Sequence, residues 1–425
     1  MQPIDKKQPA VSLPGGLSLP AARRLSVGNG SALYALDVPG SGVVRMSFVF
    51  RAGSVWQEVP FSASATANLL SEGTAELSAQ QVAERLDFYG SYFDVTIDRD
   101  YAVITFCTLG RFFEPTLEIA RQVLLAPTFP EAEVETYRNK RRESLAVERA
   151  KVSVQARELF ARTLFGADHP YGISSPESRY DELRRQDLER FYRRRYRAAN
   201  CFAVCSGELS ERIESGVADL LAALPGGTDD RPLSMPAPQR APHAFLRHEG
   251  AVQSAVRVGR LLFPRSHPDF VGMQVTSTLL GGYFGSRLVR NLREERGYTY
   301  GVFATMVNLD RCGYLAVATD VAADATADTV EQIFAEMNRL RTETVSDEEL
   351  RIVRHMLHGE VMRILDGPFG IADVTIENIQ NGRDNDYLEE FMTRIREITP
   401  AQIRALAERY LVPEEFTTVV VGEHE

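Results

Sequence analysis

A pattern of residues recurs in the two halves of the chain, and this repetition constrains the fold more than any other feature. In the first half a helical stretch ends at Tyr196, a strand-like run starts at Phe202, and a Gly-Glu pair closes that run. In the second half Tyr410, Phe416 and another Gly-Glu pair follow in the same order. The offset is 214 residues at both aromatic positions and 215 at the glycines. The shared order of elements indicates a duplicated domain.

A proline-rich segment separates the two halves. Residues 225–243 contain five prolines together with Gly, Asp and Ser, a composition typical of a linker. The full length of 425 residues also exceeds one ordinary core. We therefore expect a first domain at 1–224, the linker at 225–243 and a second domain at 244–425. In each half strand-like runs precede clustered helical stretches, which predicts an α+β fold. Each of the two homologous domains is then a mainly antiparallel sheet with helices packed on it.

Charge and hydropathy exclude several functional classes. The net charge of −10 and the pI near 5.4 argue against binding of nucleic acid or an anionic membrane. The sequence contains no apolar run of about 18 residues, so we expect no membrane span. The N-terminal segment lacks the apolar stretch of a secretory leader. A cytoplasmic location is expected, or a periplasmic one if a leader has been removed. The four cysteines are expected to be small buried side chains in a reducing compartment.

One short segment, LVRNLREERGYTYG at Leu288–Gly301, carries the clearest candidate chemistry. Its apolar spacing predicts an amphipathic helix, Gly297 predicts the end of that helix, and the aromatic and β-branched run from Tyr298 predicts a strand. Such a corner can bring Arg293, in the last helical turn, close to Tyr300 on the strand. Spacing alone favours a simpler interpretation, a solvated arginine near a helix C-terminus and an ordinary packed tyrosine.

Taken together, these features resemble the insulinase/pitrilysin-like zinc metallopeptidases, in the short-subunit branch that includes mitochondrial processing peptidase. The resemblance covers nearly the whole chain. It rests on a strand that ends in Gly53-Ser54, a helix before Gly73-Thr74, the duplication, the linker and the Arg–Tyr corner. It implies two homologous α+β domains. Two such chains or halves would close like a clamshell around a peptidase chamber.

The zinc motif of this family, H-x-x-E-H, supplies two histidine ligands and a glutamate base from one helix. Aligned on the flanking glycines, the motif falls on Ser64-Ala65-Thr66-Ala67-Asn68. Ser64 and Asn68 then replace the two ligands, Ala67 replaces the base, and the third ligand falls near Glu143. Serine and asparagine are not usual zinc ligands, and alanine cannot accept a proton from water. The resemblance therefore implies that this chain holds no catalytic zinc.

A second family motif, R-x-x-R-G-x-x-Y, matches the run from Arg293 to Tyr300 at every fixed position. In active members this arginine and tyrosine approach the zinc site of the facing half and bind the substrate at the scissile bond. A guanidinium and a phenol can both donate hydrogen bonds to a carbonyl oxygen as it becomes an oxyanion. The family's loop at Gly281, Gly282 and Tyr283 is linked to substrate entry, so these residues are expected to face the substrate.

The resemblance thus implies a non-zinc subunit of a heterodimeric zinc endopeptidase, as in bacterial heterodimers of this family. Its partner would be a homologous zinc-bearing subunit, its substrates unfolded or extended peptides, and the chain alone would be inactive. The alternative is a proteolytically inactive structural or peptide-binding homologue, as a homodimer or scaffold subunit. His355 and His358 are the only clustered histidines, but they lack the zinc-motif spacing. We expect them to be exposed helix residues.

Overall fold

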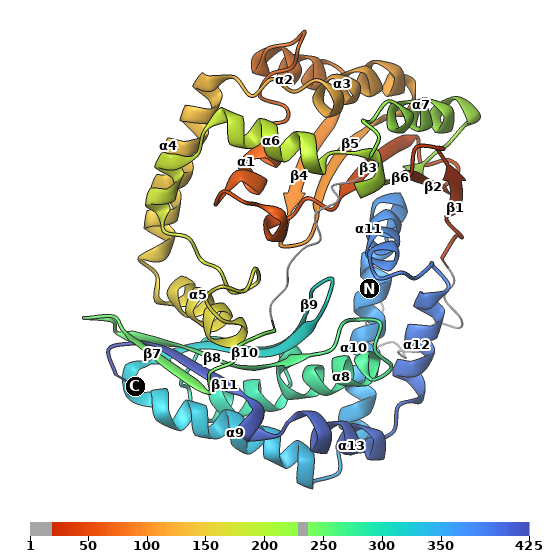
Figure 1. The fold of residues 1–425 in the computed structure, drawn as a ribbon. Helices are drawn as coiled ribbons and strands as arrows, with labels where there is room; N and C mark the ends of the chain where they lie inside the picture. The colour runs from red at the N-terminus through yellow and green to blue at the C-terminus, as the bar shows by residue number, and fades with distance from the viewer. Residues whose placement is uncertain (1–18, 228–236, 425) are drawn as a thin grey trace, which may run out of the picture.

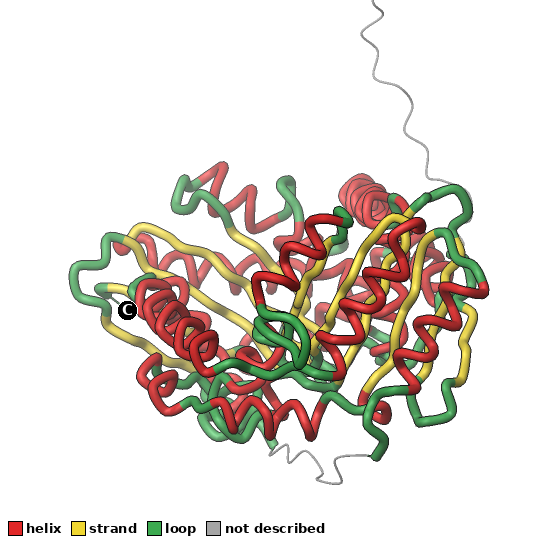
Figure 2. Tube along the Cα trace, turned by 90° about the horizontal axis from the view of Figure 1, so that it is seen from above, coloured by secondary structure: helices red, strands yellow, loops and turns green. Residues whose placement is uncertain are grey.

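Two sheets, one from each half of the chain, form the frame of the molecule in the computed structural model, which describes residues 19–227 and 237–424 (Figure 1). The strands of the first sheet lie in the order β1-β2-β6-β3-β5-β4 and those of the second in the order β7-β11-β8-β10-β9. Neighbouring strands are antiparallel except for β2–β6 and β7–β11. Figure 2 shows the strands of both sheets flanked by helices. The predicted fold class is confirmed.

The strands are short and regular. The first sheet contains β1 (Arg23–Ser26), β2 (Ala32–Asp37), β3 (Val43–Phe50), β4 (Tyr92–Ile97), β5 (Ala102–Leu109) and β6 (Cys201–Gly207). The second contains β7 (His243–Arg247), β8 (Gln253–Leu262), β9 (Val302–Asn308), β10 (Gly313–Ala322) and β11 (Thr417–Gly422). Burial alternates residue by residue along β10, because successive side chains of a strand point to opposite faces of the sheet.

The helices follow the same order in the two halves. The first half contains α1 (Ser62–Asn68), α2 (Ala79–Phe88), α3 (Phe113–Leu125), α4 (Glu131–Arg149), α5 (Val152–Phe165), α6 (Arg185–Arg195) and α7 (Glu211–Ala222). The second half contains α8 (Phe270–Ser277), the π-helical segments η5 (Thr278–Gly282) and η6 (Val289–Glu295), α9 (Thr326–Thr342), α10 (Asp347–Ile364), α11 (Gly367–Gln380), α12 (Tyr387–Glu397) and α13 (Pro400–Tyr410). None of the described helices is long and apolar enough to cross a membrane.

Each half lends one helix to the sheet of the other half. Helix α5 packs on β8 and β11 of the second sheet, and α11 packs on β6 and β3 of the first (Figure 1). The two helices start and end 215 residues apart, so they are equivalent members of the duplication. Phe160 of α5 is buried with Val419 of β11, and Ile376 of α11 is buried with Val204 of β6. Separating the halves would expose both apolar contacts.

The turns of two equivalent hairpins meet where the halves touch. Asp100, in the β4–β5 turn, accepts the backbone N–H of Asp310 at 3.0 Å, and Tyr101 donates its hydroxyl to Asp310 Oδ1 at 2.7 Å. The Tyr171 hydroxyl donates to Asp100 Oδ1 at 2.7 Å. Asp100 is buried, and this burial raises its pKa, although the hydrogen bonds from Asp310 and Tyr171 oppose the rise. We call this group of residues the hairpin junction.

Several predicted features lie partly outside the described residues or differ from expectation. Residues 1–18 of the expected first domain and residues 228–236 of the expected linker are not described. The last residue of the expected linker, His243, begins β7, a strand that the sequence did not predict. All four cysteines are free thiols, but only two of them are buried, whereas Cys107 and Cys312 are half-buried. Cys107 lies on β5, between β3 and the edge strand β4, and Cys312 lies in the β9–β10 turn.

Candidate functional site

A pocket of about 580 Å³ opens beside the corner between η6 and β9. The five residues singled out from the sequence all line it: Gly281, Gly282, Tyr283, Arg293 and Tyr300. Strands β8 and β10 contribute the opposite wall. The fold therefore brings the predicted loop and the predicted Arg–Tyr pair into one pocket. We call it the Arg–Tyr pocket.

The Arg293 guanidinium lies between two aromatic rings. Its central carbon is 4.9 Å from the ring centroid of Phe284 and 5.0 Å from that of Tyr300. Contacts of this kind are attractive because the ring face carries negative charge. No acidic side chain among the described residues forms a salt bridge with Arg293, and the Tyr300 side chain is 90% exposed. The guanidinium N–H groups and the phenol are therefore available to a ligand.

The helix that carries Arg293 is wider than the sequence predicted. The backbone N–H of Arg296 bonds to the carbonyl of Asn291 at 3.1 Å, the five-residue spacing of a π-helix. The apolar spacing that predicted an amphipathic helix fits α and π geometry alike, so it could not distinguish them. Gly297 follows with φ +68°, a left-handed conformation that favours glycine, and the helix ends there as predicted.

Tyr300 does not lie on the strand, as the sequence predicted, but in the bend before β9 starts at Val302. The Thr299 side chain explains the late start. Its hydroxyl lies 2.8 Å from the Asp320 carbonyl oxygen and accepts the Gly301 N–H at 3.1 Å. These bonds replace strand-ladder bonds at the point where β9 would otherwise begin. The phenol of Tyr300 consequently projects from a bend and can contact Arg293.

A contact between Asn291 of η6 and Glu336 of α9, which the sequence did not single out, links the two helices. Asn291 donates its side-chain amide to Glu336 Oε1 at 2.8 Å, and its amide oxygen accepts from Arg296 Nε at 2.9 Å. Glu336 on α9 is buried, with 3% of its surface exposed. A buried carboxylate thus holds the helix through an amide bridge. Nothing in the sequence around Asn291 or Glu336 indicates that they meet, because they lie 45 residues apart.

The side chains at the positions of the family's zinc motif make bonds within α1 itself. The Ser64 hydroxyl donates to the Phe61 carbonyl at 3.0 Å, and the Asn68 amide donates to the Ser64 carbonyl at 2.7 Å. Ala67 is fully buried in the core of the first half. Glu143, the expected third-ligand position, is exposed on α4. These donors do not fit a catalytic zinc ion. Residues 19–227 and 237–424 contain no group of three His, Cys, Asp or Glu side chains that could hold a metal.

Phenols and a guanidinium from α4 and the segment after α5 face this part of α1. Burial raises the pKa of Tyr137, and the nearby Ser64 hydroxyl and Arg141 guanidinium oppose that rise. Tyr180 stacks on Phe61 with ring centroids 3.9 Å apart. An arginine and two tyrosines therefore surround the helix position at which family members present metal ligands.

The expectation of exposed helix histidines is wrong, because His355 is half-buried and His358 is buried. For His358 the structure shows the cause. This residue has only 2% of its surface exposed, and its Nδ1 lies 2.7 Å from the Arg354 carbonyl oxygen. Burial lowers the pKa of His358, which favours the neutral ring. The apolar residues of α10 that precede it turn His358 toward the protein interior.

Comparison with known proteins finds similarity to the family that the sequence resembles. Residues 182–357 match the family described as Peptidase M16 inactive domain. A Mycobacterium leprae protein named uncharacterized zinc protease is 24% identical over 97% of this chain and 91% of its own length. A Streptomyces coelicolor protein that is also named uncharacterized zinc protease is 23% identical over 80% of this chain and 76% of its own length.

Two solved structures have the same fold over almost the whole chain. A structure described as a peptidase M16 inactive domain from Pseudomonas fluorescens gives a TM-score of 0.88 at 23% identity, covering 95% of this chain and 98% of that one. A structure described as a protease from Helicobacter pylori gives a TM-score of 0.85 at 16% identity, covering 95% of this chain and 100% of that one.

Proposed function

The chain is related to the insulinase-like zinc metallopeptidases, and from this premise we propose that it is the non-zinc subunit of a heterodimeric zinc endopeptidase. In this proposal a homologous partner subunit carries H-x-x-E-H and the zinc ion. The present chain binds an extended peptide and adds Arg293 and Tyr300 to the partner's site. It has no proteolytic activity alone, because α1 offers neither metal ligands nor a base.

The observation that carries the proposal is the exposed Arg–Tyr pair in its pocket. Tyr300 and Phe284 expose 90% and 64% of their surfaces, yet both rings are held against one guanidinium. A large aromatic side chain loses about 1.5–3 kcal/mol of burial energy when it stays in water. Exposed rings around a cation at a pocket are therefore characteristic of a binding surface rather than of packing.

The chemistry assigned to this chain is hydrogen bonding to the scissile carbonyl. The partner's zinc would polarise that carbonyl and activate a water molecule. Arg293 and Tyr300 would donate N–H and O–H groups to the oxygen as negative charge develops on it. Loss of one such donor typically lowers kcat by about 10²–10³-fold. The peptide itself would run beside β9, an edge strand of the second sheet that adjoins the pocket.

We also place the complex in the cytoplasm. The four cysteines are free thiols, and free thiols persist in a reducing compartment.

The test is reconstitution with the zinc-bearing partner purified from the same cells. Tyr300→Phe and Arg293→Met should each lower peptidase kcat by about 10²-fold while the complex stays intact in gel filtration. Arg290→Met is the matched control, because Arg290 is exposed on the same helix but does not line the Arg–Tyr pocket. Unchanged activity in both pocket variants would instead support the structural or peptide-binding homologue. Stoichiometric zinc and peptide cleavage by this chain alone would refute the proposal.

A further inference from the structure

A second pocket, of about 400 Å³, lies against α1 where the family's zinc motif is lost. We call it the arginine pocket, because Arg99, Arg149 and Arg157 line it together with Ser64, Phe61 and Ile173. These residues come from the β4–β5 turn, the α4–α5 corner, α5, the start of α1 and the loop after α5. Ser64 stands at the first ligand position of the motif. The pocket therefore occupies part of the space beside the former metal helix.

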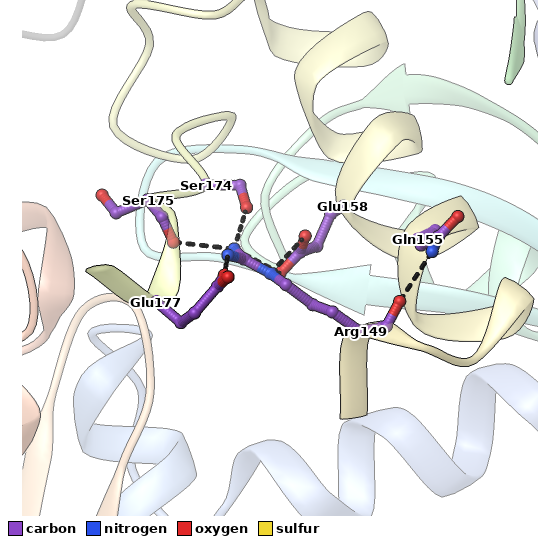
Figure 3. A network of polar contacts seen from close by, with 6 residues as sticks. All are labelled: Arg149, Gln155, Glu158, Ser174, Ser175 and Glu177. Carbon is purple, nitrogen blue, oxygen red and sulfur yellow. Dashed lines mark hydrogen bonds and ion pairs between the residues drawn. The ribbon is translucent and has the colours of Figure 1, made fainter. Parts of the chain in front are cut away.

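Arg149 serves as a structural support of this pocket (Figure 3). Its guanidinium binds Glu158 of α5 at 3.0 Å and Glu177 at 3.0 Å. It also donates to the Ser174 hydroxyl and the Ser175 carbonyl at 2.8 and 2.7 Å. Its positive charge is therefore balanced within the protein. The network fixes the α4–α5 corner to the loop that carries Ile173, so one wall of the pocket is held in place.

The acidic side chains that line the pocket are also engaged. Glu158 is bound by Arg149, and Glu58 lies 2.6 Å from Arg194 on α6. Neither carboxylate is therefore left to neutralise Arg99 or Arg157. Among the described residues no acidic side chain forms an ion pair with either of these two arginines. Two arginines without an ion-pair partner among the described residues thus line one pocket of a chain whose net charge is −10.

The backbone that carries Arg99 is fixed, although its side chain forms no hydrogen bond or ion pair with another described residue. The carbonyl of Arg99 accepts the N–H of Val55 at 2.9 Å, and the next carbonyl, of Asp100, accepts the N–H of Gly53 at 3.0 Å. A Cβ at Gly53 would lie 2.4 Å from the Arg99 backbone, so glycine is needed for this close approach. Arg99 is half-buried, whereas Arg157 is exposed on α5.

The remaining lining adds apolar surface beside the two cations. Phe61, Val55 and Leu145 form part of the wall, and Ile173 exposes 54% of its surface at the rim. Apolar walls exclude water and strengthen the attraction between unlike charges. The complementary ligand is an anionic group carried on an apolar segment. In a peptide the group of that kind is a carboxylate, at the C-terminus or on an acidic side chain next to apolar residues.

We propose that the arginine pocket binds a carboxylate of the peptide substrate, with Arg99 and Arg157 as its ion-pair partners. The proposal rests on the proposed function, since it requires that this chain binds peptides. In this proposal a cationic binding site lies beside the helix on which the zinc motif of the resembled family would fall. The chain selects peptides by a negative group at this pocket while the Arg–Tyr pocket holds the scissile region.

Fluorescence anisotropy with the full chain and short labelled peptides tests this assignment. Each peptide is made with a free C-terminus and as the C-terminal amide, and with either Glu or Gln beside an apolar residue. Loss of the carboxylate that binds should weaken affinity roughly tenfold, as for a hydrogen-bonded charged pair. The amide arm detects a terminal carboxylate and the Gln arm detects a side-chain carboxylate. Binding of the preferred peptide should also weaken as salt is raised.

Variants then assign the effect to the pocket. Arg99→Gln combined with Arg157→Gln should abolish the preference for the carboxylate. Arg85→Gln, which removes the same charge from exposed α2, should leave it unchanged. Equal affinity for all four peptides, or a preference that survives the double variant, would overturn the carboxylate site and leave the proposed function standing. Absence of binding by any peptide would overturn both.

Discussion

The hairpin junction gives the sharpest test of how the two halves are joined. Tyr171→Phe removes one hydroxyl and little else. That hydroxyl donates to Asp100 Oδ1 at 2.7 Å, Tyr171 is 1% exposed, and Asp100 is 8% exposed. Water cannot easily replace the lost donor at such a site. A hydrogen bond to a charged group typically contributes about 1.5–3 kcal/mol, so we expect a loss of about 2 kcal/mol.

The expected change in melting temperature is small but measurable. At about 2.1 cal/mol/K of unfolding entropy per residue, a loss of about 2 kcal/mol lowers the Tm of a chain this long by roughly 2 °C. Differential scanning fluorimetry measures such a shift. Tyr92→Phe is the matched control, because the Tyr92 side chain is 61% exposed and donates no hydrogen bond to a described residue. Its Tm should stay within about 0.5 °C, since surface changes fall within roughly 0.5 kcal/mol.

The pH dependence provides a second readout of the same bond. Burial raises the pKa of Asp100, and the Tyr171 hydroxyl opposes that rise. The pKa of Asp100 is higher in the folded state than in the unfolded state. Its contribution to the free energy of unfolding is therefore fully present below the unfolded-state pKa, and it is lost as the pH rises through the folded-state pKa. Without the hydroxyl the folded pKa rises further. The Tm difference between wild type and Tyr171→Phe should therefore be largest near neutral pH and narrow as the pH is lowered. An equal Tm at neutral pH, or a difference that does not change with pH, would refute this account of the junction.

Three other predictions address the remaining sites. Arg149→Met removes two ion pairs and the hydrogen bonds to Ser174 and Ser175. We expect this variant to lower the free energy of unfolding by about 2 kcal/mol in thermal melts. Arg212→Met is the control, because its ion pair is exposed to solvent. Asn291→Ala leaves the buried Glu336 without its amide donor. We therefore expect kcat of the reconstituted complex to fall about tenfold while KM changes little. An unchanged kcat would contradict a positioning role for Asn291. Addition of a chelator should leave the Tm of the isolated chain unchanged, because α1 offers no zinc ligands, and a drop of several degrees would reveal a bound metal.

The sequence predicted individual elements well where local rules decide them. Gly297 was predicted to end the helix that carries Arg293, and η6 ends just before it in the structure, where Gly297 adopts φ +68°. The sequence did not predict the exchange of α5 and α11 between the halves. An apolar helix face indicates that the helix is buried, but not against which sheet it packs. That choice depends on tertiary contacts such as Phe160 against Val419.

The candidate site was likewise predicted only where its residues are neighbours in the sequence. A spacing motif identified Arg293 and Tyr300 because its members are neighbours in sequence. Phe284, whose ring covers the other side of the guanidinium, was missed because the loop that carries it folds back onto the helix. The π-helical turn was missed because its apolar spacing also fits an α-helix. The roles of Arg293 and Tyr300 in catalysis stay a prediction.

The fold of the first half does not depend on a metal ion at α1. Helix α1 packs on α6 and on β4 through buried small residues such as Ala63 and Ala67, and these contacts need no zinc. A structural zinc ion contributes folding energy, whereas a catalytic ion mainly serves the reaction. The presence of Ser64, Arg99 and Arg157 in one pocket therefore supports the proposal that this space beside α1 serves peptide binding rather than chemistry.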